Sequence, residues 1–91
     1  MAALDELLKV LSEYLGLKKR LEDLLKAYGA SGPEDIELKI RRGELPKNKN
    51  YEGYRKVYED LAEAFSIQYE LMTLEKKLEK MVEARGPVDN R

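Results

Sequence analysis

The feature that most constrains the fold of this chain is a long stretch without proline in its C-terminal half. From residue 51 to residue 84, apolar side chains recur every three or four positions. This spacing predicts a single amphipathic helix about 50 Å long, at about 1.5 Å per residue. A helix of that length needs another apolar surface to cover its apolar stripe. The rest of the chain is expected to supply that surface.

The N-terminal part of the chain predicts a second long helix, over residues 2–28. Leucines and tyrosines at positions 7, 11, 14, 17, 21, 24 and 28 repeat about every 3.5 residues, which favours a left-handed supercoil with a neighbouring helix. Gly29 suits the end of this helix, because glycine readily adopts the left-handed conformation found there. Gly16 lies inside it at a cost of about 1 kcal/mol relative to alanine, and we interpret it as a tolerated or closely packed position.

A short element is expected between the two long helices. Ser31, with a glutamate three residues later, has the spacing of a capping box, and Gly43 can end a helix. A helix over residues 33–42 would place Ile36 and Ile40 on one face. The same segment alternates apolar and polar residues and would also fit a strand, but a single strand has no partner in this chain. We therefore predict a short helix.

The remaining segments are a connector and a tail. Pro46 blocks helix continuation in the connector at residues 43–50, and Asn48 or Asn50 can cap the long helix that follows. Residues 85–91 contain glycine and proline after the long helix and are expected to be flexible. The whole chain of 91 residues is thus predicted to be one all-α domain with a long, a short and a long helix.

The two long helices have matching apolar seams and are predicted to pair as an antiparallel hairpin. The apolar face of the first helix spans more than half of its circumference, which one partner helix cannot cover. A domain of this size buries only about 60–65% of its unfolded surface, so a second copy would stabilise it. We therefore predict a homodimer that completes a four-helix-type bundle. The central interface contacts are expected to be Leu11, Leu21, Leu61, Phe65 and Leu71.

The composition excludes several chemistries. The chain has neither cysteine nor histidine, which excludes disulfides, thiolate metal sites and histidine-based acid–base catalysis. The formal net charge of −1 provides no overall attraction for nucleic acid or an anionic membrane. The N-terminus lacks a basic region before a long apolar run, so we expect a cytoplasmic protein without a membrane span. The abundance of leucine, lysine and glutamate resembles a thermophilic composition.

Charge is distributed unevenly along the chain. Residues 57–75 carry acidic but no basic side chains, whereas residues 39–56 are rich in lysine and arginine with tyrosines between them. Basic and aromatic side chains together suit contacts with phosphates and bases, so nucleic-acid binding at the connector is the alternative function. In the competing interpretation, the tyrosines belong to the core and the lysines and arginines pair with nearby carboxylates. The candidate nucleic-acid contacts are Arg41, Arg42, Lys47, Lys49, Tyr51 and Arg55.

A small helical enzyme, either metal-dependent or of mutase type, is the remote alternative. A mutase-type pocket for a dicarboxylate could use Lys18, an arginine next to the connector, and Gln68. Lys18 can equally lie along apolar surface with its amine in water, and Gln68 can fix the register of a helix interface. The acidic pairs with a spacing that could hold magnesium are Glu34 with Glu37 and Asp60 with Glu63.

The prediction favoured by these patterns is a non-enzymatic helical assembly or adaptor module. Its apolar helix faces would bind a second copy, a larger protein, or both. The acidic side chains of the long helix fall opposite its apolar face and are expected in solvent, so we predict no catalytic residue, metal ligand or cofactor.

Overall fold

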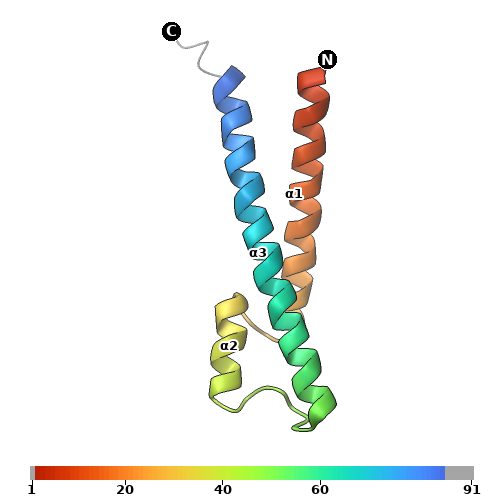
Figure 1. The fold of residues 1–91 in the computed structure, drawn as a ribbon, viewed down its shortest axis with the longest axis vertical. Helices are drawn as coiled ribbons and strands as arrows, with labels where there is room; N and C mark the ends of the chain where they lie inside the picture. Colours follow the sequence, from red (N-terminus) through yellow and green to blue (C-terminus); the bar gives the residue numbers. More distant parts are fainter. Residues whose placement is uncertain (1, 86–91) are drawn as a thin grey trace.

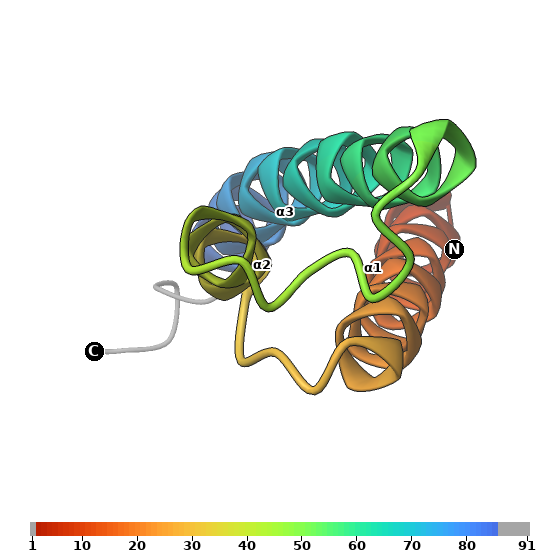
Figure 2. The same ribbon diagram turned by 90° about the horizontal axis from the view of Figure 1, so that it is seen from below.

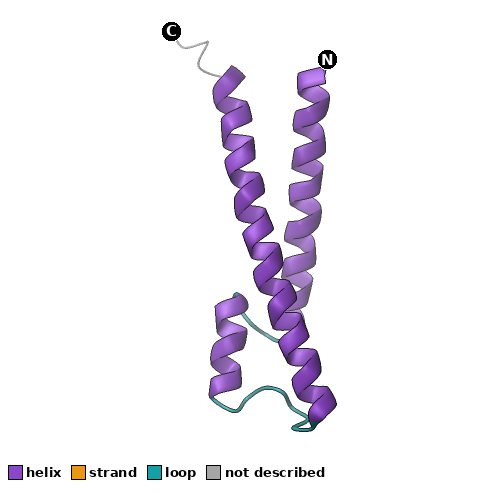
Figure 3. Ribbon diagram, in the orientation of Figure 1, coloured by secondary structure: helices purple, strands orange, loops and turns teal. Residues whose placement is uncertain are grey.

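The computed structural model describes residues 2–85, with side-chain surroundings described for residues 4–83, and the described part of the chain folds into three helices (Figure 1). They are α1 (Ala2–Ala27), α2 (Pro33–Arg41) and α3 (Tyr51–Arg85). Loops join them, and no strand occurs within residues 2–85 (Figure 3). The predicted all-α order of a long, a short and a long helix is confirmed, and the predicted helix ends agree with the observed ones to within one residue.

The predicted flexible tail begins one residue too early. Arg85 is the last residue of α3 rather than the first of the tail. The rest of that prediction, residues 86–91, lies outside the described residues.

The two long helices pack against each other as the predicted antiparallel hairpin (Figure 1). The molecule is elongated, with principal extents of 59 × 23 × 15 Å. Val10 of α1 and Ala64 and Ile67 of α3 are buried along this hairpin. The seam therefore runs through Val10 and leaves Leu11, which the sequence analysis placed in the seam, exposed beside it.

The second packing contact joins α2 to the closed half of the hairpin, where the connector lies. Ile36 of α2, Leu45 of the connector and Val57 of α3 form a buried cluster. Leu25 and Leu61, from the two long helices, pack against it. The short helix is therefore held by apolar residues from every part of the fold.

Glycine and asparagine end or begin the helices where the sequence indicated. Gly29 and Gly43 have φ values of 61° and 78°, which side chains with a Cβ rarely adopt. Asn50 accepts a 2.8 Å hydrogen bond from the Gly53 N–H through its side chain, so it caps α3. The predicted capping box at Ser31 is wrong. Gly32, which has no side chain to offer, takes the N-cap position of α2 in place of Ser31. The Ser31 backbone N–H donates a 3.0 Å hydrogen bond to the Asp35 carboxylate.

The connector is a packed part of the structure. It crosses beneath the helices from the end of α2 to the start of α3 (Figure 2). Leu45 and Pro46 are buried, and the peptide bond between them is cis. Lys49 Nζ donates hydrogen bonds of 2.9 Å to the Gly43 carbonyl and 2.6 Å to the Pro46 carbonyl. Residues 43–50 are therefore held in place by hydrogen bonds and burial within the connector itself.

Candidate interaction surfaces

One side of the hairpin carries ion pairs. Arg20 Nη2 of α1 lies 2.6 Å from Glu63 Oε2 of α3. Nearer the free ends of the helices, Lys77 Nζ lies 3.9 Å from Glu6 Oε2. At about 100° per residue, Glu6 and Arg20 share one face of α1, and Glu63 and Lys77 share one face of α3. We call this the ion-paired side.

The opposite side of α1 carries four leucines at intervals of three or four residues, which we call the leucine stripe. Because residues at this spacing share a helical face, the four side chains form one continuous apolar strip. Leu8 and Leu15 are 54% and 56% exposed, so this strip faces water along its length. The leucine stripe consists of Leu4, Leu8, Leu11 and Leu15.

α3 carries a matching strip, which we call the aromatic stripe: Phe65, Tyr69 and Met72. Tyr69 is 71% exposed and Met72 is 52% exposed, while Phe65 is half-buried. The flanking positions on the outer edge hold the small uncharged residues Ala62, Ser66 and Thr73.

Both stripes lie on the side of the hairpin opposite the ion-paired side, which we call the apolar side, and α2 packs against the first turns of α3 near the connector. Leu61 of α3 packs against the α2 cluster, and Phe65 and Met72 follow it by about one and three helical turns on the same face. α2 therefore covers this face of α3 near the connector, whereas the two stripes lie beyond it and are exposed.

The predicted interface residues fall into two groups. Leu21, Leu61 and Leu71 are half-buried at or next to the seam within the hairpin, whereas Leu11 belongs to the exposed leucine stripe and Phe65 to the aromatic stripe. Ile67 is also buried in the seam, although the sequence did not mark it as an interface residue. The spacing of three residues between Ala64 and Ile67 indicates that both lie on the same helix face.

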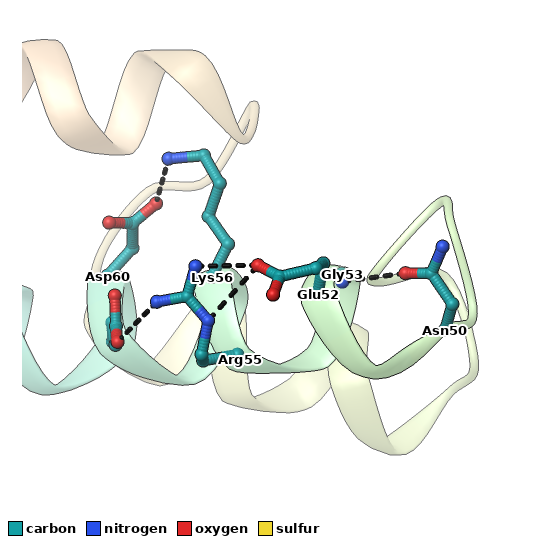
Figure 4. A network of polar contacts seen from close by, with 7 residues as sticks. Asn50, Glu52, Gly53, Arg55, Lys56 and Asp60 are labelled. Carbon is teal, nitrogen blue, oxygen red and sulfur yellow. Dashed lines mark hydrogen bonds and ion pairs between the residues drawn. The ribbon is translucent and has the colours of Figure 1, made fainter.

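The basic connector and its surroundings are rich in internal ion pairs. Arg55 reaches Glu52 at 2.6 Å and Glu59 at 2.8 Å (Figure 4). These hydrogen bonds to two carboxylates raise the pKa of Arg55. Lys56 Nζ lies 3.3 Å from Asp60 Oδ2 in the same network.

The two arginines at the end of α2 are paired as well. Arg41 lies 3.6 Å from Glu37, and Arg42 lies 4.0 Å from Glu44. Lys49 is engaged by backbone carbonyls. Among the six candidate nucleic-acid contacts, the described residues provide no ionic or hydrogen-bond partner for the side chains of Lys47 and Tyr51. The positive charge of this region is thus largely matched by carboxylates.

A pocket of about 650 Å³ lies between the end of α1, the connector and the first turns of α3. Leu45, Pro46 and Val57 contribute apolar surface to it. Lys47 and Arg55 bring two of the candidate contacts to its lining, together with Lys56, Asn48 and Asn50. Arg41 and Arg42 do not line this pocket.

Two tyrosines, Tyr14 of α1 and Tyr28 just after the end of α1, donate hydrogen bonds to carboxylates of α3. The Tyr28 hydroxyl donates a hydrogen bond to Asp60, and partial burial together with this bond raises the pKa of Tyr28 above its ordinary value near 10. The Tyr14 hydroxyl donates a 2.8 Å hydrogen bond to Glu75, which raises the pKa of Tyr14. Both contacts hold the two long helices in register.

The side chains considered for an enzyme site are separated or engaged elsewhere. Asp60 accepts hydrogen bonds from Tyr28 and Lys56, and Glu63 is paired with Arg20. Within residues 2–85, no three acidic side chains gather in a cluster that could hold a metal ion. The Lys18 amine lies 5.9 Å from the centre of the Tyr14 ring, a cation–π geometry.

The half-buried Gln68 belongs to α3, on the apolar side near Phe65 and Met72. Neither Lys18 nor Gln68 lines the pocket beside the connector, so the structure does not gather the residues of the mutase-type hypothesis there.

Comparisons with protein-family models, with curated proteins and with solved structures give no match. The described helices also contain no segment that is both long and apolar enough to cross a membrane.

Proposed function

We propose that this protein is a non-enzymatic assembly module that self-associates through the open half of its apolar side. The observation that carries the proposal is the leucine stripe. Four exposed leucines in register on one helix face are costly in water, because each buried side chain of this size contributes about 1.5–3 kcal/mol. A second copy of the chain supplies a matching apolar surface.

The composition of the two stripes supports a binding surface. Protein interfaces are enriched in tyrosine, phenylalanine and methionine and depleted of charge at their centres. The aromatic stripe and its small neighbours have this composition, and residues 64–69 contain no charged side chain. Methionine also adapts its shape to a partner surface.

The test is the mass of the protein in solution, measured by sedimentation equilibrium over micromolar concentrations. The proposal expects a dimer for the wild type and a monomer for Leu8→Lys, because a buried lysine within the stripe leaves a charge unpaired. Tyr51→Lys is the matched control, since Tyr51 is 77% exposed and lies away from both stripes. A wild type that stays monomeric would contradict the proposal.

Nucleic-acid binding at the connector is the second candidate function. It is favoured by the pocket beside the connector, where Lys47, Arg55 and Lys56 meet amide side chains and apolar surface. The internal ion pairs of Arg41, Arg42 and Arg55 weigh against it, because phosphate would have to displace carboxylates.

The test of this second candidate is fluorescence anisotropy with labelled single-stranded and duplex RNA and DNA at two salt concentrations. The informative variant combines Arg42→Ala, Lys47→Ala and Arg55→Ala. It retains Lys49, whose hydrogen bonds hold the connector. Salt-sensitive binding that this variant loses would support the candidate, and failure to bind at low salt would contradict it.

A further inference from the structure

The pocket beside the connector is built from three separate parts of the chain. Ala27 ends α1, Leu45 and Pro46 belong to the connector, and Val57 belongs to α3. The volume of about 650 Å³ lies within the range of about 300–1,000 Å³ that is usual for sites of small organic molecules. The leucine stripe ends at Leu15, about 18 Å before Ala27 along α1, so binding in this pocket is independent of the proposed self-association.

The walls of the pocket are held in place without a ligand. Leu45 and Val57 belong to the buried cluster that joins α2 to the hairpin. Asn50 accepts a hydrogen bond from the Gly53 N–H (Figure 4). A Cβ at Gly53 would overlap the Asn48 carbonyl, so the connector backbone lies directly against α3. A site that is formed in advance loses little conformational entropy when a ligand binds.

Apolar and charged side chains are separated by depth within the pocket. Leu45, Pro46 and Val57 are buried and form its base. The charged lining residues are all exposed and form its mouth: Lys47, Glu52, Arg55 and Lys56. Three of these are basic and one is acidic, which gives the mouth a formal charge of +2, whereas the whole chain carries −1. The pocket thus combines an apolar base with a positively charged mouth.

Two lysines at the mouth are available to a ligand. Lys47 is exposed, and the described residues contain no ion-pair partner for it. Lys56 Nζ lies 3.3 Å from Asp60, but the Lys56 side chain is 73% exposed, so water screens that pair. Arg55 is engaged more closely, at 2.6 Å and 2.8 Å from two carboxylates. An anionic group at the mouth therefore has Lys47 as its main counter-ion and Lys56 as the second.

We infer that this pocket binds a small organic anion, with an apolar body on the buried base and a carboxylate, sulfonate or phosphate beside Lys47. The lining favours such a molecule over nucleic acid. Sites for single-stranded nucleic acid offer exposed aromatic rings on which bases stack. The exposed tyrosines near the connector, Tyr51, Tyr54 and Tyr58, do not line the pocket.

Naphthalene-1-sulfonate is a suitable probe, because it joins an apolar ring system to one anionic group. Naphthalene-1-sulfonamide is its neutral counterpart of nearly the same shape. Nuclear magnetic resonance of the glycine amides locates the site, since Gly29 and Gly53 line the pocket, whereas Gly16 follows Leu15 of the leucine stripe. We expect the sulfonate to shift the Gly29 and Gly53 resonances saturably and to leave Gly16 unchanged. The sulfonamide should bind about 1.5- to 5-fold more weakly, the difference that an exposed ion pair makes.

Lys47→Glu is the informative variant, because no described contact of the fold depends on the Lys47 side chain. It replaces an attraction by a repulsion of the size of exposed ion pairs, so the sulfonate should bind about 2- to 30-fold more weakly. The affinity for the sulfonamide should stay nearly unchanged. Lys80→Glu is the matched control, with the same change of charge about 40 Å from Gly53 along α3. Leu8→Lys, which tests self-association, should leave the affinity of the pocket unchanged.

Several results would overturn the inference. The first is a sulfonate that shifts neither Gly29 nor Gly53, whether or not Gly16 responds. The second is equal affinity for the sulfonate and the sulfonamide in the wild type, which would mean that the anionic group makes no contact with the mouth. The third is an equal loss of affinity in Lys47→Glu and Lys80→Glu. A wild type that binds the probe as expected but stays monomeric would contradict only the proposed self-association.

Discussion

Arg20 and Glu63 form a 2.6 Å ion pair that joins α1 to α3 on the side of the hairpin opposite the leucine stripe. Their side chains are 63% and 37% exposed, so water screens the interaction. We expect a double-mutant cycle with Arg20→Ala and Glu63→Ala to give a coupling free energy of about 0.2–1 kcal/mol, measured by urea unfolding. Neither substitution should change the oligomeric state. Dissociation caused by Arg20→Ala would place the interface on the ion-paired side instead.

Substitution by alanine should change the free energy of unfolding in opposite directions at two glycines within helices, Gly16 and Gly53. A Cβ at Gly16 meets no atom within 4 Å, so Gly16→Ala should raise the free energy of unfolding by about 0.5–1 kcal/mol through helix propensity. A Cβ at Gly53 would overlap the backbone carbonyl of Asn48, so Gly53→Ala should destabilise the protein. Urea unfolding of the two variants measures both changes. Stabilisation by Gly53→Ala would mean that the connector moves away from α3 freely.

The order and ends of the helices could be predicted because they depend on local chemistry. Apolar periodicity defines α1 and α3, and Gly29 and Gly43 end the first two helices through positive φ values that the residue type makes available. The capping of α2 was predicted wrongly, because Gly32 and not Ser31 occupies the N-cap position. Ser31 instead donates its backbone N–H to the Asp35 carboxylate.

The packing of α2 could not be predicted, because it depends on contacts between distant residues. Leu45 appeared to belong to a linker, yet it is buried with Ile36 and Val57. The seam between the long helices was displaced by one position, from Leu11 to Val10, because both residues fit a broad apolar face. For the connector, the sequence allowed pairing between cations and nearby carboxylates, but only the folded geometry identifies partners such as Glu52 and Glu59 for Arg55.

The stability of the folded protein should fall at alkaline pH because of the Tyr28 hydroxyl. Its pKa in the folded protein is raised above the ordinary value near 10 by burial and by the bond to Asp60. The folded state therefore holds this proton more tightly than the unfolded state does. The stabilisation is fully present below about pH 10 and is lost as the pH rises through the folded pKa.

Phenolate absorbance tests this prediction in a titration of the six tyrosines. Tyr28→Phe should remove the latest part of the titration, and the stability difference from wild type should shrink above about pH 10. Tyr69→Phe is the control, because Tyr69 is 71% exposed and its loss should leave that late part unchanged. A Tyr28 that titrates together with the exposed tyrosines would contradict the contact with Asp60.

Ile36 and Leu38, two of the apolar residues of α2, should differ strongly in their contribution to stability. Ile36 is fully buried, whereas Leu38 is 39% exposed on the same short helix. Ile36→Ala should lower the free energy of unfolding by about 2–5 kcal/mol, since the cavity would lie within the cluster that joins α2 to the hairpin. Leu38→Ala should cost less than about 1 kcal/mol, because much of its side chain already contacts water. Circular dichroism during urea unfolding measures both values. Equal losses for the two variants would mean that α2 is not anchored through Ile36.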